Sequence, residues 1–246
     1  MSSVPADPVK QTPTLEPLPP DHPAIPNVED IVLSDGMPVE SVYAQAIGRM
    51  LCEILYGSWQ PGAPFLAVSN VGLFYRTGTP AIVPDVMVKM DSPPRGDFFK
   101  TNYNNGFFTW DRGVPEIAIE VVLKTDGGET TDKVRIYETA GVPNYVVWDP
   151  AGFQSDREIR YWGSSSSGLV ETEIPEVLPR VGLGLRAWEG VYDGDSGRWL
   201  RWFDAQGEML LTKGEVAEEQ SQLAAEQKRR AEAAEAELAR LRERLG

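Results

Sequence analysis

The sequence predicts a mixed α/β fold of the α+β kind, with a central sheet flanked by helices and one long helix after it. Three observations predict this fold. Residues 39–56 repeat apolar side chains at helical spacing, and residues 114–148 read as strand, helix and strand. Residues 213–246 are rich in Glu and Ala and nearly free of Gly and Pro. With 41% hydrophobic residues, the chain can build one sizeable core.

The chain begins with a segment of distinct composition, residues 1–29, which contains eight prolines and little periodicity. This composition predicts a disordered, proline-rich leader, and a docking segment for a partner is the functional alternative. The folded domain is therefore expected over residues 30–212, and the C-terminal helix over residues 213–246.

The first helix is predicted over residues 39–56, with Gly57 ending it. Its apolar positions recur three and four residues apart: Val39, Tyr43, Ala46, Ile47, Met50, Leu51 and Ile54. Strands are expected near residues 65–68, 72–76 and 82–90. The stretch that follows, residues 95–113, is rich in aromatic residues, Asn and Gly, and it is expected to be a loop or a hairpin tip.

A strand–helix–strand unit is predicted next. A strand over residues 114–123 leads to a helix that ends at Gly141, and a strand over residues 144–148 follows. Thr130 or Thr131 can cap this helix. Two strands joined by a helix in so short a span should be parallel neighbours in one sheet.

The C-terminal part is predicted to contain short strands over residues 157–203, a hairpin over residues 202–210 and then the long helix. A thin apolar stripe runs along the helix at roughly heptad spacing: Val216, Leu223, Ala234, Leu238, Leu241 and Leu245. Two interpretations stay open. The helix either pairs as a coiled coil, which would make the protein a homodimer, or stays single.

Composition excludes several kinds of chemistry. The chain has one histidine, His22, and one cysteine, Cys52, so a Cys/His zinc site and a Ser-His-Asp or Cys-His site are excluded. A single cysteine, with no signal-peptide pattern and no apolar run long enough to cross a membrane, favours the cytoplasm. The net charge of −14 limits any nucleic-acid binding to a local patch. Carboxylates, lysines, hydroxyls and a hard cation such as Mg²⁺ remain.

Four charged residues form the candidate site. Asp85 stands at a predicted strand start, Glu120 lies inside the strand EIAIEVVL, Lys124 ends that strand, and Lys133 lies in the first turn of the next helix. Strand alternation puts Glu120 on the same face as the small residue Ala118, which leaves room beside the carboxylate. From these residues alone, Glu120 is either half of a structural ion pair or part of a functional site.

The motifs resemble a known family. Pro84-Asp85 at a strand start, VPEIAIEV around Glu120, a helix with tyrosine four residues after Lys133, and the stretch AGVPNYVVWDP are similar to the Uma2 family, also called DUF820. That family belongs to the restriction-endonuclease-like PD-(D/E)xK nuclease superfamily. The resemblance covers roughly residues 33–211, and GVPNYVVWDP is its most specific part.

The resemblance implies a restriction-endonuclease-like core and a Mg²⁺- or Mn²⁺-dependent endonuclease acting on DNA. Asp85 and Glu120 match the metal-binding acids of the superfamily, and Glu40 could be a third. The superfamily lysine position, two residues after the second acid, holds Val122 here. Lys133 is the first candidate for a migrated catalytic lysine, and Lys124 is the second.

Three further residues are candidates for contacts with substrate. Tyr137 lies one turn after Lys133 and should share its helix face. Arg95 and Lys100 are interleaved with aromatic residues that could stack on unpaired bases. The alternative is that these aromatic residues only pack against the protein. A second function also stays open, in which the fold is an inactive scaffold that binds partners through the long helix and the aromatic loop.

Overall fold

A computed structural model describes residues 41–93, 106–122 and 127–245 of the chain. The chain divides into two units, Met1–Glu40 and Ser41–Gly246. The predicted leader belongs to the first unit and lies outside the described residues. All elements below belong to the second unit.

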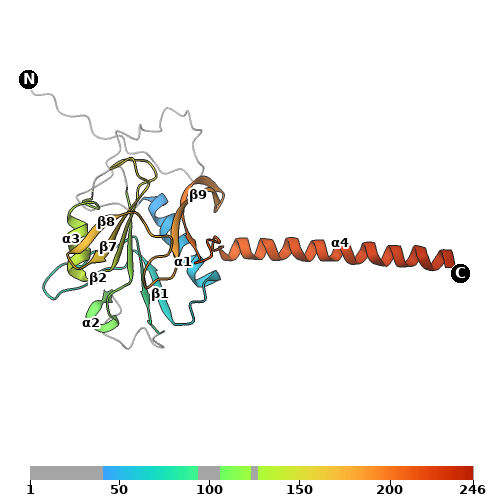
Figure 1. Ribbon diagram of the computed structural model, residues 1–246, viewed down its shortest axis with the longest axis horizontal. Coiled ribbons are helices and arrows are strands. Elements are labelled where there is room, and N and C mark those ends of the chain that lie inside the picture. Colours follow the sequence, from blue (N-terminus) through green and yellow to red (C-terminus); the bar gives the residue numbers. More distant parts are fainter. Residues whose placement is uncertain (1–40, 94–105, 123–126, 246) are drawn as a thin grey trace, which may run out of the picture. The chain divides into compact units, whose positions relative to one another are not determined.

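The centre of the second unit is a mixed six-stranded sheet (Figure 1). Its strand order is β1-β3-β5-β6-β7-β8. The strands are β1 (Phe65–Ser69), β3 (Val86–Met90), β5 (Ile117–Val121), β6 (Asn144–Trp148), β7 (Ile159–Ser165) and β8 (Gly168–Thr172). Only β5 and β6 pair in parallel within this sheet, and the other neighbours are antiparallel. The mixed central sheet expected from the sequence is therefore confirmed.

Both faces of the sheet are covered, and strand alternation decides which side chain goes where. Ile117, Ile119 and Val121 of β5 join the core formed with helix α1 (Val42–Ser58). Ala118 and Val122 join a second core on the opposite face, next to helix α3 (Asp132–Ala140). Figure 1 shows α1 and α3 on opposite sides of the sheet.

Helix α1 follows the predicted apolar stripe closely. Ile47, Met50, Leu51 and Ile54 are all buried. The helix begins three residues later than predicted, because the Ser41 side chain caps it by accepting a hydrogen bond from Ala44 N at 3.0 Å. It also continues through Gly57 to Ser58.

The unit β5–α3–β6 has the predicted parallel strands. Gly141 ends α3 in the left-handed conformation, with φ of 80°, as a C-terminal glycine can. The start of the helix differs in detail, because the Thr131 side chain makes no capping hydrogen bond. The Gly128 carbonyl instead accepts hydrogen bonds from the backbone of Thr131 and of Lys133.

Part of the predicted aromatic loop is ordered structure, so the prediction of irregular structure was wrong there. Strand β4 (Phe107–Phe108) pairs in parallel with β2 (Leu73–Phe74), and the short helix α2 (Thr109–Arg112) follows. Phe107 is buried, and Phe108 stacks on Phe74 with 4.6 Å between the ring centroids. These two aromatic rings pack against the protein, as the simpler alternative held.

Two long strands follow the sheet, β9 (Gly184–Tyr192) and β10 (Asp195–Phe203), and they pair with each other. They are anchored to α1, where Trp202 Nε1 donates to the Leu51 carbonyl at 3.1 Å. The predicted hairpin over residues 202–210 is present as a small turn, closed by a bridge between Phe203 and Met209.

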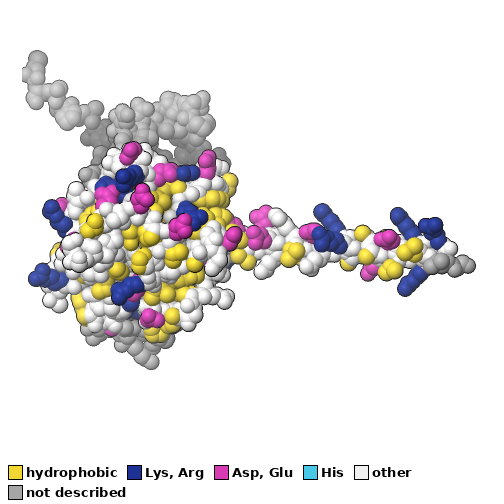
Figure 2. Space-filling view, viewed as in Figure 1, with side chains coloured by type: hydrophobic (Ala, Val, Ile, Leu, Met, Phe, Trp, Pro, Cys, Tyr) yellow, Lys and Arg dark blue, Asp and Glu magenta, His cyan; other side chains and the backbone are white. Residues whose placement is uncertain are grey.

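Helix α4 (Lys213–Leu245) ends the described chain. A reciprocal capping box starts it: Thr212 N donates to the Glu215 carboxylate, and Glu215 N donates to Thr212 Oγ1. Residues 217–244 are exposed, and charges of both signs are spread along them (Figure 2). Among the described helices, none is long and apolar enough to cross a membrane.

Candidate active site

Glu120 is the centre of the site. Its side chain is on the α3 face of β5, where strand alternation places it beside Ala118, and the residue is only 2% exposed. Its neighbour in the parallel strand β6 is Val147. A buried carboxylate in a sheet core is strongly destabilising unless hydrogen bonds or charges compensate it.

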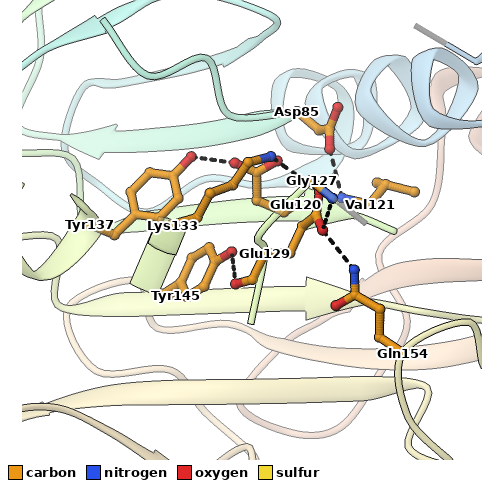
Figure 3. A network of polar contacts seen from close by, with 9 residues as sticks. All are labelled: Asp85, Glu120, Val121, Gly127, Glu129, Lys133, Tyr137, Tyr145 and Gln154. Carbon is orange, nitrogen blue, oxygen red and sulfur yellow. Dashed lines mark hydrogen bonds and ion pairs between the residues drawn. The ribbon is translucent and has the colours of Figure 1, made fainter. Parts of the chain in front are cut away.

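Helix α3 supplies the compensation. Lys133 Nζ lies 2.9 Å from Glu120 Oε2, and Tyr137 OH donates to Glu120 Oε1 at 2.6 Å (Figure 3). The two side chains are four residues apart, so one helix face presents both to the carboxylate. The predicted shared face of Lys133 and Tyr137 is confirmed.

Asp85 comes from the other side of Glu120. It immediately precedes β3, whose first residue, Val86, pairs with Ile119 of β5. Asp85 Oδ2 accepts a hydrogen bond from Val121 N at 2.6 Å, which fixes the carboxylate next to the backbone of Glu120. The structure thus brings Asp85, Glu120, Lys133 and Tyr137 together.

The electrostatics of the site follow from burial and crowding. Burial raises the pKa of Glu120 to about 8, Lys133 opposes this shift, and the charge of Asp85 adds to it. For Lys133, burial lowers the pKa, but Glu120 and Glu129 outweigh it and leave the pKa raised. Burial and Glu120 also raise the pKa of Tyr137, which keeps its hydroxyl a donor.

A second carboxylate contacts the same ammonium group. Glu129 is 6% exposed, and its Oε1 lies 3.3 Å from Lys133 Nζ. Its Oε2 accepts from Gly127 N at 3.0 Å and from Gln154 Nε2 at 2.7 Å. Tyr145 OH donates to the Glu129 carbonyl at 2.7 Å. Lys133 is therefore fixed between two carboxylates.

Asp149 explains how Gln154 reaches the site. The Asp149 carboxylate accepts backbone hydrogen bonds from Phe153, Gln154 and Ser155, at 2.9, 2.8 and 3.3 Å. Asp149 thereby folds the loop after β6 back toward Glu129. The aspartate of the WDP motif acts here as the organiser of a loop.

Comparison with known proteins identifies the family of this chain. The family model Uma2, described as "Putative restriction endonuclease", matches residues 30–174, which is more than half of the chain. The chain belongs to the Uma2 family. Restriction-endonuclease-like families of this kind generally use divalent metal ions, and family membership indicates a nuclease and hence a hydrolase that binds nucleic acid.

One solved structure similar to this Uma2 chain is a crystal structure titled as a putative nuclease belonging to DUF820 from Anabaena variabilis. It is 14% identical, with 51% of this chain and 70% of that chain covered, and the TM-score is 0.34. No curated protein matches the chain.

The donor set of this Uma2 site fits a hard divalent cation. Asp85 and Glu120 offer carboxylate oxygens, and a cation would stabilise the ionised form of Glu120, which burial and, to a lesser extent, the charge of Asp85 disfavour. No group of three acidic, histidine or cysteine side chains able to hold a metal is present within the described ranges. Two carboxylates are enough for Mg²⁺, which keeps several waters as ligands.

Four of the candidate residues lie outside the described part of the chain: Glu40, Arg95, Lys100 and Lys124. Two residues of the site were not predicted from the sequence. Glu129 had a usable signal, because it stands four residues before Lys133, the spacing of a helical ion pair. Gln154 had no local signal, because only the folded loop brings it to Glu129.

Proposed function

We propose that this Uma2 protein is a metal-dependent endonuclease that hydrolyses phosphodiester bonds of DNA. The observation that carries the proposal is the buried Glu120, held by Lys133 and Tyr137 and faced by Asp85. Such a set of two acids and a lysine provides what phosphodiester hydrolysis needs, which is an aligned water and compensation of developing negative charge.

The alternative, a purely structural ion pair, accounts less well for the charges. Lys133 contacts two carboxylates, Glu120 and Glu129, and both are almost fully buried. If both carboxylates ionise, this group of three carries a net negative charge, which Glu120 offsets by holding a proton at its raised pKa and which a divalent cation would offset instead. A buried pair that served only stability would be expected to balance its charges.

Each residue has a role in the proposal. Asp85 and Glu120 would hold Mg²⁺ or Mn²⁺, which supplies charge neutralisation of the phosphate and a more acidic water. Tyr137 fixes the orientation of Glu120 through the 2.6 Å hydrogen bond. Lys133, kept charged between two acids, would donate hydrogen bonds to the phosphate oxygens and orient the attacking water.

The remaining candidates lie outside the described residues and would extend this site. Glu40 would be a third metal ligand, and Lys124 a second lysine near the phosphate. Arg95 and Lys100 would contact the substrate backbone. We place the activity in the cytoplasm, since the single cysteine favours a compartment with reduced thiols.

Incubation of the purified protein with DNA in Mg²⁺ or Mn²⁺ tests the proposal. We expect the wild type to cleave plasmid DNA, and Glu120→Gln to lower the rate at least about 100-fold, because a charged metal ligand is lost. Glu235→Gln is a matched control, since Glu235 is exposed on α4. Cleavage that persists in the Glu120→Gln variant contradicts the proposal.

A second candidate function is an interaction protein that has kept the nuclease fold as a scaffold. It is favoured by α4, where Leu223, Leu238 and Leu241 are 56%, 53% and 45% exposed. We propose that these side chains pair two copies of α4 as a coiled coil, which makes a homodimer.

Calorimetric titration with Mn²⁺ separates the two functions. Binding by the wild type and its loss in Asp85→Asn favour the nuclease, whereas no binding by either protein favours the scaffold. Light scattering of the wild type and of Leu238→Glu tests the homodimer. A wild type that is monomeric at high concentration contradicts pairing through α4.

A further inference from the structure

A cavity adjoins the candidate active site on the side of Lys133. It lies between the segment that leads from β2 to β3 and the beginning of α3, and its volume is about 330 Å³. This volume is at the lower end of the range for small-ligand sites in proteins. Its lining residues are Tyr75, Thr79, Pro80, Ala81, Ile82, Gly127, Asp132, Lys133 and Ile136.

The lining favours a largely apolar group that can pack against an aromatic ring. Pro80, Ala81, Ile82 and Ile136 give apolar walls, and Tyr75 adds an aromatic ring. A free phosphate does not suit this cavity. Asp132 is mostly exposed and lies 3.8 Å from Arg135, and its carboxylate can still accept a hydrogen bond from an exocyclic amino group.

Lys133 links the cavity to the candidate active site. Its ammonium group contacts Glu120 and Glu129, while the residue also lines the cavity. A phosphate bound at the ammonium group therefore has the cavity as its immediate neighbour. In a nucleic acid strand, the group attached next to a backbone phosphate is a sugar and its base.

We propose that this cavity takes the base of an unpaired nucleotide that adjoins the cleaved bond, stacked against Tyr75. This inference rests on the proposed nuclease function and names its substrate class, single-stranded nucleic acid or a strand with an extruded base. In a duplex, every base is paired and stacked, so entry to the cavity requires unstacking, which disfavours duplex substrates.

Binding and cleavage of one labelled oligonucleotide test the inference, as a single strand and as its duplex. Binding is followed by fluorescence anisotropy with Ca²⁺ in place of Mg²⁺, and cleavage is followed with Mg²⁺ or Mn²⁺. We expect the wild type to prefer the single strand. Tyr75→Ala should weaken single-strand binding roughly 10- to 100-fold, since base stacking on an aromatic ring has that effect.

Two further variants make the test specific. Tyr75→Phe keeps the ring and should bind the single strand like the wild type. Ala81→Phe fills the cavity and should lower single-strand affinity while leaving Tyr75 in place. This variant therefore still tests the inference if Tyr75→Ala folds poorly. Circular dichroism melting of each variant reports its folding.

The outcomes separate this inference from the proposed function. A wild type that cleaves neither form contradicts the nuclease function. A wild type that prefers duplex, fails to bind single strands, or loses no affinity in Tyr75→Ala and Ala81→Phe overturns the base cavity, whatever the cleavage result.

Discussion

Two ion pairs in this molecule, each with a buried partner, have similar chemistry and different surroundings. At the base of α4, Arg201 is fully buried and donates to both oxygens of Glu215, at 3.0 and 2.8 Å. It also donates to the Leu210 carbonyl and stacks over Trp188. At α3, Lys133 contacts Glu120 and Glu129 together.

The two carboxylates respond in opposite directions. For Glu215, burial raises the pKa, but the hydrogen bonds from Arg201 and Thr212 outweigh it, and the pKa is lowered. For Glu120, burial prevails over Lys133, and the pKa rises to about 8. The pair at α4 is balanced one to one and fixes a helix in place. At α3, two buried carboxylates share one ammonium group, and the raised pKa of Glu120 lets it hold a proton that a bound cation would displace.

The largest stability effect is expected from breaking the balanced pair. Arg201→Met should lower the free energy of unfolding by about 3–5 kcal/mol, because Glu215 loses its partner and the start of α4 loses its anchor. Urea denaturation followed by tryptophan fluorescence measures the change. A loss below about 1 kcal/mol would show that Arg201 does not hold α4 in place.

The equivalent change at α3 should separate stability from activity. Lys133→Met should lower the free energy of unfolding by only about 1–2 kcal/mol, because Glu120 can take up a proton once its partner is gone. Cleavage should fall about 100-fold or more. Denaturation and cleavage assays on the same preparation measure both. A stability loss as large as that of Arg201→Met would make the α3 pair a structural one.

The raised pKa of Glu120 predicts a pH-dependent stability. The folded protein holds this proton more tightly than the unfolded chain, whose ordinary pKa is 4.5. The stability from this group is therefore complete below pH 4.5 and is lost as the pH rises to about 8. The slope should reach at most about 1.4 kcal/mol per pH unit.

Denaturation at several pH values, without divalent cations, measures that slope. The free energy of unfolding of Glu120→Gln should vary less steeply with pH than that of the wild type. The difference in slope should correspond to at most one proton. Equal slopes in the two proteins would mean that Glu120 is already ionised throughout this range.

The smallest effect is expected at Glu129. Glu129→Gln keeps an oxygen for Gly127 N but weakens the second hold on Lys133, so the turnover rate should fall about 3- to 10-fold with little change in stability. Glu138→Gln, on the adjoining helix α3, is the control. Steady-state cleavage rates measure the effect. A loss as large as that of Lys133→Met would make Glu129 a direct participant in the reaction.

Much of the fold was predictable because the signals were local. Alternation along β5 assigned Ala118 and Glu120 to one face, and the helical spacing of Lys133 and Tyr137 brought both to the same carboxylate. The parallel strands followed from the strand–helix–strand order. Uma2 membership was predictable from the motifs, GVPNYVVWDP above all.

The remainder depends on tertiary structure. Gln154 reaches Glu129 only because Asp149 folds the loop after β6. No local pattern around Gln154 or Asp149 in the sequence predicts this contact. The pairing of Phe107–Phe108 with Leu73–Phe74 joins segments far apart in the chain. Arg201 and Glu215 come together only when β10 and α4 meet.

Cys52 has a practical consequence for experiments on this protein. It is the only cysteine in the chain, it packs against the core from α1, and burial raises the pKa of its thiol to about 12. The thiolate is the reactive form, so Cys52 should react very slowly with maleimides at neutral pH. A cysteine introduced at an exposed site on α4, such as Ser221→Cys, would then be the only site labelled by a thiol-reactive spin label. Cys52 would not need to be replaced. In the proposed homodimer, distances between labels on the two copies would report whether the helices run parallel or antiparallel.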